Sequence, residues 1–117
     1  MLTISKEQYQ KFEKDAWNSF VYRVVTFLRE EMPKHVIIFD DAQLTNRIER
    51  STKLAEAFGL LNEYDIVCFL MAGLLLGDEQ FYKNPKYSPM RSILENVHIE
   101  SDDKAEQILT VAVQQLV

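Results

Sequence analysis

The amino-acid sequence predicts an all-α protein: a single compact bundle of about five helices, with a long N-terminal helix and a buried central helix. The 117 residues include only three Gly and three Pro, too few for the many tight turns of an all-β sandwich or barrel. Apolar residues also recur at gaps of three and four over long stretches, the spacing of amphipathic helices. The length and an apolar content of 47% suit one helical domain spanning residues 1–117.

The first helix is expected over about residues 6–31. Ser5 and Gln8 form a capping-box pattern, in which each side chain binds the backbone N–H of the other residue. Pro33 ends the pattern, because the residue before a proline is pushed out of the helical region. One apolar stripe runs between these signals, at Tyr9, Phe12, Ala16, Phe20, Val24, Phe27 and Leu28.

Two further segments follow before the centre of the chain. The apolar run 36–39 is interpreted as a link or a short helical turn that plugs the core, because no other segment offers it a clear strand partner. Asp40 or Asp41 is expected to cap a second helix, and Gly59 follows that helix where positive φ is tolerated.

Asn62 is expected to begin the central helix. The run 66–76 is apolar on every side, so we expect it to be buried on every side, with Cys68 as an inert buried thiol. Gly73 either permits the close approach of a neighbouring helix or is merely tolerated. After an irregular segment at 77–87, Ser88 and Ser101 are expected to cap two last helices.

Charge and segment lengths exclude several classes of protein. Thirteen Lys and Arg against eighteen Asp and Glu give a net charge of −5, which disfavours nucleic-acid binding. The longest apolar run has eleven residues, whereas a bilayer requires about twenty, so no membrane insertion is expected. The start of the chain turns polar at once and predicts no signal peptide. Together with the lone cysteine, this predicts a cytoplasmic protein.

The sequence offers no motif for catalysis, a cofactor or a metal. Three isolated glycines cannot form a phosphate-binding loop, and one Cys with two His lacks the spacing of a zinc site. The adjacent acids 40–41 and 102–103 lie where helix caps are expected. We therefore expect a non-enzymatic protein with no cofactor, whose work is binding.

Two groups of residues are candidates for contact with a protein partner. The basic residues are either a solvated face of charge pairs or a surface for an acidic partner, since Arg binds carboxylates bidentately. The aromatic residues either plug the core or anchor an interface. The candidates are Arg23, Arg29, Arg47 and Arg50, with Lys53 beside them, and Trp17, Phe81, Tyr82 and Tyr87.

The order of features over about residues 1–100 resembles a group of small helical bacterial proteins encoded in type VI secretion effector modules. The resemblance rests on Phe20, Arg23, Phe27-Leu28-Arg29, Met32-Pro33, Ala55, Phe58-Gly59-Leu60, Glu63, Asp65, Gly77, Phe81 and Ile93-Leu94.

Such proteins are typically encoded beside a tip protein, a larger effector chaperone and a toxin. The resemblance implies a co-chaperone or adaptor that binds the effector's chaperone, or the effector itself, before loading onto the tip. The alternative is an immunity protein that neutralises a cognate toxin, for which an acidic net charge suits a basic nuclease toxin. The oligomeric state stays open.

Overall fold

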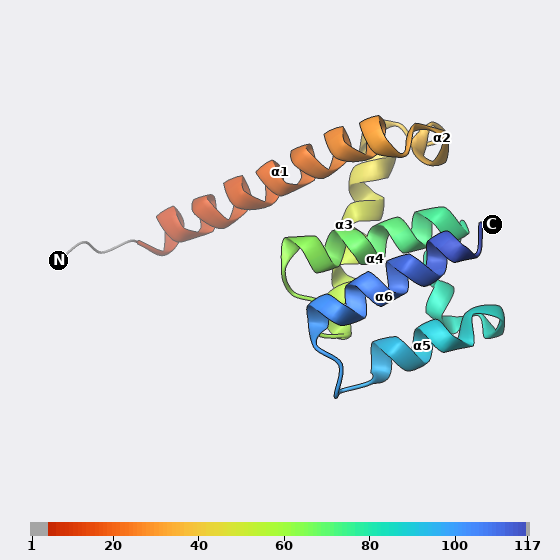
Figure 1. Ribbon diagram of the computed structural model, residues 1–117. Helices are drawn as coiled ribbons and strands as arrows, with labels where there is room; N and C mark the ends of the chain where they lie inside the picture. The colour runs from red at the N-terminus through yellow and green to blue at the C-terminus, as the bar shows by residue number, and fades with distance from the viewer. Residues whose placement is uncertain (1–4, 117) are drawn as a thin grey trace.

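The computed structural model describes residues 5–116 and confirms the all-α prediction: every regular element in that range is a helix. Six α-helices and two 3-10 turns follow one another along the chain (Figure 1). They are α1 (Lys6–Glu31), α2 (Pro33–Val36), α3 (Asp41–Ala57), α4 (Glu63–Leu76), η1 (Phe81–Lys83), η2 (Pro85–Tyr87), α5 (Ser88–Glu95) and α6 (Ser101–Gln114).

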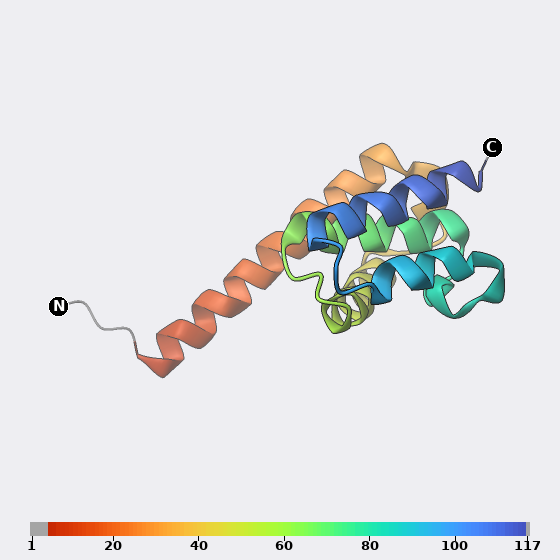
Figure 2. The same cartoon turned by 60° about the horizontal axis from the view of Figure 1, so that its bottom comes forward.

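The long helix α1 begins and ends where the sequence predicts. Ser5 Oγ accepts the backbone N–H of Gln8 at 3.1 Å, and Gln8 Oε1 accepts the backbone N–H of Ser5 at 2.9 Å. Met32, before Pro33, caps the other end. Only the second half of α1 is held by the rest of the molecule. Every residue from 6 to 16 is exposed, and this projecting half of α1 extends away from the other helices in both views (Figures 1 and 2).

The core lies around α4 and α6, which run side by side (Figure 2). Ile66, Phe69 and Leu70 of α4 are buried, and so are Ile108 and Ala112 of α6. Helix α3 packs behind α4 and contributes Leu44, Ile48 and Ala55 to the core. We call α2 to α6, with the attached second half of α1, the body.

A basic side chain fastens the second half of α1 to the connection that follows it. Arg29 donates to the carbonyl oxygens of Val36 and Phe39, both at 2.8 Å, and to Asp41 Oδ1 at 2.9 Å. The run 36–39, predicted as a link or helical turn, contains the end of α2 and the turn after it. Val36 is fully buried and therefore plugs the core as expected, whereas Ile37 and Ile38 are exposed.

Three of the five predicted N-caps are confirmed: Ser5, Asp40 and Asn62 each accept a backbone N–H three residues on. The other two predictions are wrong by one residue. Ser88 and Ser101 are the first residues of α5 and α6, and the caps are Tyr87 and Glu100, neither with a side-chain capping bond. At Ser88 the 3-10 turn η2 already leads into α5, so no extended capping residue precedes the helix.

Gly73 makes room for a side chain of the neighbouring helix α3, whereas the interpretation from the sequence was the close approach of a helix. A Cβ at this position would lie 3.1 Å from Nη2 of Arg47 and 3.3 Å from the carbonyl oxygen of Asp78. The guanidinium of Arg47, from α3, therefore packs directly against the backbone of α4. Gly77 ends α4 with φ of +66°, a left-handed conformation that favours glycine.

Candidate protein-binding groove

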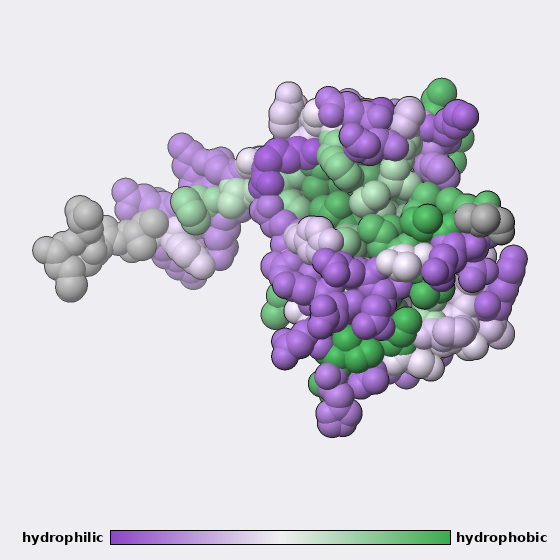
Figure 3. All heavy atoms as spheres, viewed as in Figure 1, coloured by the Kyte–Doolittle hydropathy of each residue, from purple (hydrophilic) through white to green (hydrophobic). Residues whose placement is uncertain are grey.

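An apolar groove lies between the second half of α1 and the pair α4 and α6. Its volume is about 530 Å³. The space-filling view shows a hydrophobic band beside the same half of α1 (Figure 3). Its apolar walls are Phe20, Val24 and Phe27 of α1, Tyr64, Val67, Cys68 and Met71 of α4, and Leu109 of α6.

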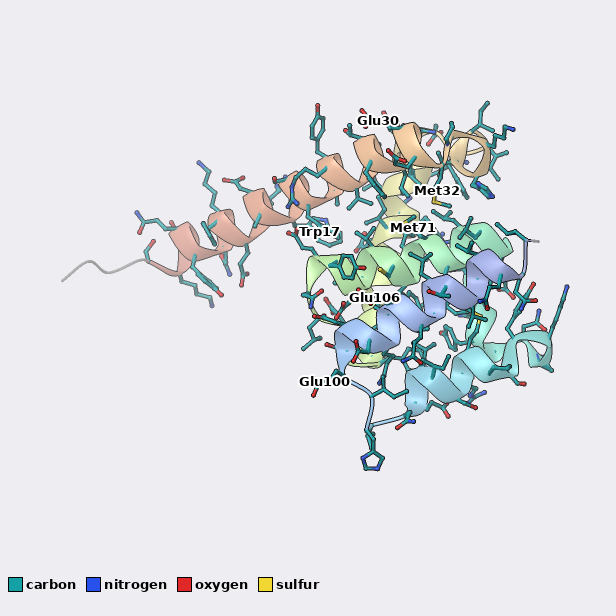
Figure 4. The ribbon with its side chains drawn as sticks, in the orientation of Figure 1. Trp17, Glu30, Met32, Met71, Glu100 and Glu106 are labelled. Carbon is teal, nitrogen blue, oxygen red and sulfur yellow. The ribbon has the colours of Figure 1, made fainter. Side chains whose placement is uncertain are left out.

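The groove exists because α1 is attached through α2 and α3 more than through α4. Val24 and Leu28 face the body and are buried, while Phe27, on the adjoining side of the helix, remains 39% exposed. Met71 lies on α4 facing this open side (Figure 4). The sequence predicted α4 to be buried on every side. That prediction is too strong, since Val67 and Met71 are only half-buried at the groove.

Charged and polar pairs border the groove. Arg23 Nη1 and Nη2 donate to the two carboxylate oxygens of Glu63 at 2.8 and 2.9 Å, a bidentate pair that joins α1 to the first turn of α4. Their hydrogen bond raises the pKa of Arg23 and lowers the pKa of Glu63. Tyr64 donates its hydroxyl to Glu106 of α6 at 3.1 Å, and this hydrogen bond raises the pKa of Tyr64 to about 12.

The groove wall contains one cysteine, Cys68, whose thiol is a potential nucleophile. The thiol is buried, as predicted, and burial raises its pKa, so it remains protonated at neutral pH. Within residues 5–116, no three His, Cys, Asp or Glu side chains are grouped as metal ligands.

A second apolar surface lies on the projecting half of α1. Tyr9 is 52% exposed and Phe12 is 65% exposed, and both lie at helical spacing from Ala16 and Phe20. Trp17 stands where α1 leaves the body, with its ring 5.7 Å from that of Phe20 (Figure 4). The apolar stripe of α1 therefore continues from the groove onto the projecting half, where it lines a second, open hollow of about 330 Å³ together with Thr52 and Glu56 of α3 and Ile66 of α4.

The structure separates the predicted basic residues instead of gathering them on one face. Arg23 borders the groove, and Arg29 holds the α2 connection. Arg50 donates to Glu79 at 2.7 Å, with Arg47 4.0 Å from the same carboxylate. Arg47 is buried, and burial lowers its pKa. Arg47 is therefore corrected from a contact residue to a buried one.

The aromatic candidates divide in the same way. Phe81 and Tyr82 are buried against Phe69 and Phe58, with ring centroids 5.2 Å apart for Phe69–Phe81 and 4.9 Å for Phe58–Tyr82. Of the two interpretations of this loop, core plugging is the one the structure shows, and an interface role for Phe81 and Tyr82 is corrected. Tyr87 is half-buried at the edge of the core.

Sequence reasoning missed the groove residues Phe27, Tyr64, Val67 and Met71 as binding candidates. A signal was available: the stripe on α1 spans some twenty residues, or about 30 Å, longer than a small body can cover. The surplus of apolar residues on one side of α1 indicated that part of the stripe would lie open.

Comparisons with protein-family models, with curated proteins and with solved structures found no match for this chain. The resemblance to type VI secretion accessory proteins therefore stays a prediction. None of the helices within residues 5–116 has both the length and the hydropathy needed to cross a bilayer.

Proposed function

We propose that this chain is a non-enzymatic protein-binding accessory of the cytoplasm, a co-chaperone or adaptor that helps a larger chaperone load a type VI secretion effector. The observation that carries the binding role is the open apolar groove with its polar border. Contiguous apolar surface rimmed by polar residues marks interaction sites in soluble proteins. The secretion context rests on the sequence resemblance alone.

The shape of the groove favours a helical ligand. One wall is a straight helix, α1, and the other is the ridge formed by α4 and α6. An amphipathic helix binds such a groove through apolar anchors at every third and fourth residue. The Arg23–Glu63 pair at the border offers both a donor and an acceptor to polar residues of the ligand helix.

Co-purification from cells that express the neighbouring genes tests this function. We expect the chaperone or effector to co-purify with the wild-type chain, and Phe27→Glu, which places a charge in the groove, to reduce recovery by about tenfold. The matched control is Tyr22→Glu, since Tyr22 lies on another side of α1 and is 73% exposed.

Secretion and toxicity assays separate this role from the immunity alternative. A co-chaperone is expected to be required for secretion of the effector. Rescue of cells from the toxin, with secretion unchanged by deletion of this chain, would replace the proposal with the immunity role. Recovery of the chain alone, with neither effect, would overturn both.

A further inference from the structure

The second hollow lies beside the groove, where the projecting half of α1 meets α3 and the first turn of α4. Phe20 and Glu63 line both the hollow and the groove, so the two surfaces are continuous. The wall of the hollow on α1 is formed largely by aromatic side chains, namely Tyr9, Phe12, Trp17 and Phe20. The chain therefore presents open aromatic surface outside the groove.

The charged residues that line the second hollow are all acidic. Glu13 comes from α1, Glu56 from α3 and Glu63 from α4. The bidentate pair with Arg23 compensates the charge of Glu63. Neither Glu13 nor Glu56 forms an ion pair with another residue of the described range 5–116. Two uncompensated negative charges therefore remain beside the aromatic wall.

Trp17 is the aromatic residue nearest in sequence and position to both charges. Glu13 lies one turn before it on the same side of α1, and a hydrogen bond to Glu13 raises the pKa of Tyr9 on that side. Glu56 lines the hollow with Trp17 and also lines, again with Trp17, a smaller depression over α3. Trp17 is only half-buried where α1 leaves the body (Figure 4). An indole ring with carboxylates around it is an arrangement that binds a Lys or Arg side chain.

We propose that the second hollow binds a basic amphipathic helix of a protein partner, with a Lys or Arg side chain against Trp17 and its charge toward Glu13 and Glu56. Charge complementarity selects this occupant. An acidic helix would meet two uncompensated carboxylates, and a wholly apolar helix would desolvate them without a partner. The proposal goes beyond the proposed function and does not rest on it.

The projecting half of α1 gives the apolar side of such a ligand its contacts. Tyr9 is 52% exposed and Phe12 is 65% exposed, and both belong to the wall of the hollow. Residues 6–16 are all exposed, and isolated helices of this length are marginal in water. A bound helix would supply the packing that this segment lacks within the described chain, so binding is expected to stabilise it.

The fluorescence of Trp17 reports binding at this site, because the chain contains one tryptophan. The probe is an amphipathic helical peptide of Leu and Lys, and its counterparts carry Gln or Glu in place of every Lys. We expect the Lys peptide to shift the Trp17 emission with a dissociation constant in the micromolar range, the Gln peptide to bind about tenfold more weakly, and the Glu peptide not to bind. Equal affinity for the Lys and Gln peptides would overturn the proposal. So would calorimetric binding of the Lys peptide that leaves the Trp17 emission unchanged.

Single neutralised carboxylates separate the hollow from the net charge of the chain. Glu13→Gln and Glu56→Gln are each expected to raise the dissociation constant of the Lys peptide about threefold, and both side chains are exposed, so the fold is retained. The matched control is Glu7→Gln, which removes the same charge from another side of α1 and is expected to leave the affinity unchanged. Equal weakening by all three variants would assign the binding to the net charge of −5 and refute the site.

A free polyamine is the competing occupant, because it carries positive charge without apolar residues. Spermine is expected to shift the Trp17 emission only in the millimolar range, and an affinity equal to that of the Lys peptide would overturn the assignment to a helix. Amide hydrogen exchange gives the location: the Lys peptide is expected to slow exchange within residues 6–16. Unchanged exchange in that segment would contradict contact with the projecting half of α1.

The second hollow and the proposed function can fail separately. A chain that binds the Lys peptide at Trp17, in cells whose effector secretion does not need it, would support the hollow and refute the function. A chain that ignores the peptide but co-purifies with a secretion chaperone would refute the hollow alone.

Discussion

At the scale of single residues, Asp65 combines an acidic side chain with complete burial. Neither of its carboxylate oxygens has a hydrogen-bond partner among the described residues, and its backbone N–H donates to Asn62 at 2.8 Å. Burial raises the pKa of this carboxyl, and the neighbouring Asp102 carboxylate raises it further. A buried carboxyl group without a hydrogen-bond partner destabilises the folded state whenever it is ionised.

The raised pKa predicts the direction of a pH dependence. The folded state holds this proton more tightly than the unfolded state, so the cost of ionised Asp65 is present above the folded pKa. It is relieved as the pH falls through the folded pKa toward the unfolded value near about 3.9. We expect Asp65→Asn to stabilise the protein by about 1 kcal/mol at pH 7 and to remove this part of the pH dependence.

Urea denaturation at a series of pH values measures both effects. Asp103→Asn, a change of an exposed carboxylate in the first turn of α6, is the control and is expected to alter stability little. A destabilised Asp65→Asn at pH 7 would mean that ionised Asp65 has a partner in solution that offsets its burial.

Gly73 is the second residue whose environment makes a clear prediction. Alanine favours a helix interior over glycine by about 1 kcal/mol. Here the added Cβ would press on Arg47 and on the backbone of Asp78, and overpacking costs about 1–3 kcal/mol. We expect Gly73→Ala to destabilise the protein by about 1 kcal/mol in equilibrium unfolding. A gain in stability would show that the Arg47 side chain moves aside at no cost.

At the scale of elements, the connection from α1 to α3 depends on one guanidinium. Arg29 satisfies two backbone carbonyls and one carboxylate, and hydrogen bonds from charged donors contribute about 1.5–3 kcal/mol each when fully desolvated. Because Arg29 is partly exposed, we expect Arg29→Ala to cost about 2 kcal/mol in total.

Amide hydrogen exchange localises that effect. We expect faster exchange in α2 and in the turn at 37–39 for Arg29→Ala, with α4 and α6 unchanged. Arg29→Lys is expected to recover only part of the protection, because an ammonium cannot bind two carbonyls in the fixed geometry of a guanidinium. Equal loss of protection throughout the molecule would contradict a local role.

The elements also show which parts of the fold can be predicted from the sequence. The bounds of α1, the caps at Asp40 and Asn62 and the positive φ of Gly59 follow from local chemistry, and each was predicted. The groove depends on the angle at which α1 leaves α3 and α4, and that angle arises from tertiary packing. The length of the apolar stripe on α1 therefore indicated that part of it would lie open, but the sequence did not show that Phe27 and Met71 would border the open part.

The same limit explains the errors among the charged and aromatic candidates. Arg47 has the spacing of a surface residue on α3, and only the absence of a side chain at Gly73 makes room for it inside. Phe81 and Tyr82 lie in a loop by composition, and the loop folds inward because Phe58 and Phe69 offer rings to pack against. Both outcomes depend on partners far away in sequence.

At the scale of the whole molecule, the projecting half of α1 lengthens the molecule but contributes little to its stability. The radius of gyration is 15.7 Å, whereas a compact chain of this length has about 13 Å. The difference comes from the helix that extends beyond the body (Figure 2). Since all of residues 6–14 are exposed, that segment contributes little to the folding of the monomer.

Removal of residues 1–14 tests whether the projecting half of α1 affects the shape of the molecule without affecting its stability. We expect the free energy of unfolding to change by less than about 1 kcal/mol, because no buried contact among the described residues is lost. In small-angle scattering, at concentrations where both chains are monomeric, the radius of gyration should fall toward about 13 Å. A large loss of stability in the shortened monomer would instead mean that the projecting half of α1 folds back onto its own body in solution, and that the groove is filled from within the same chain.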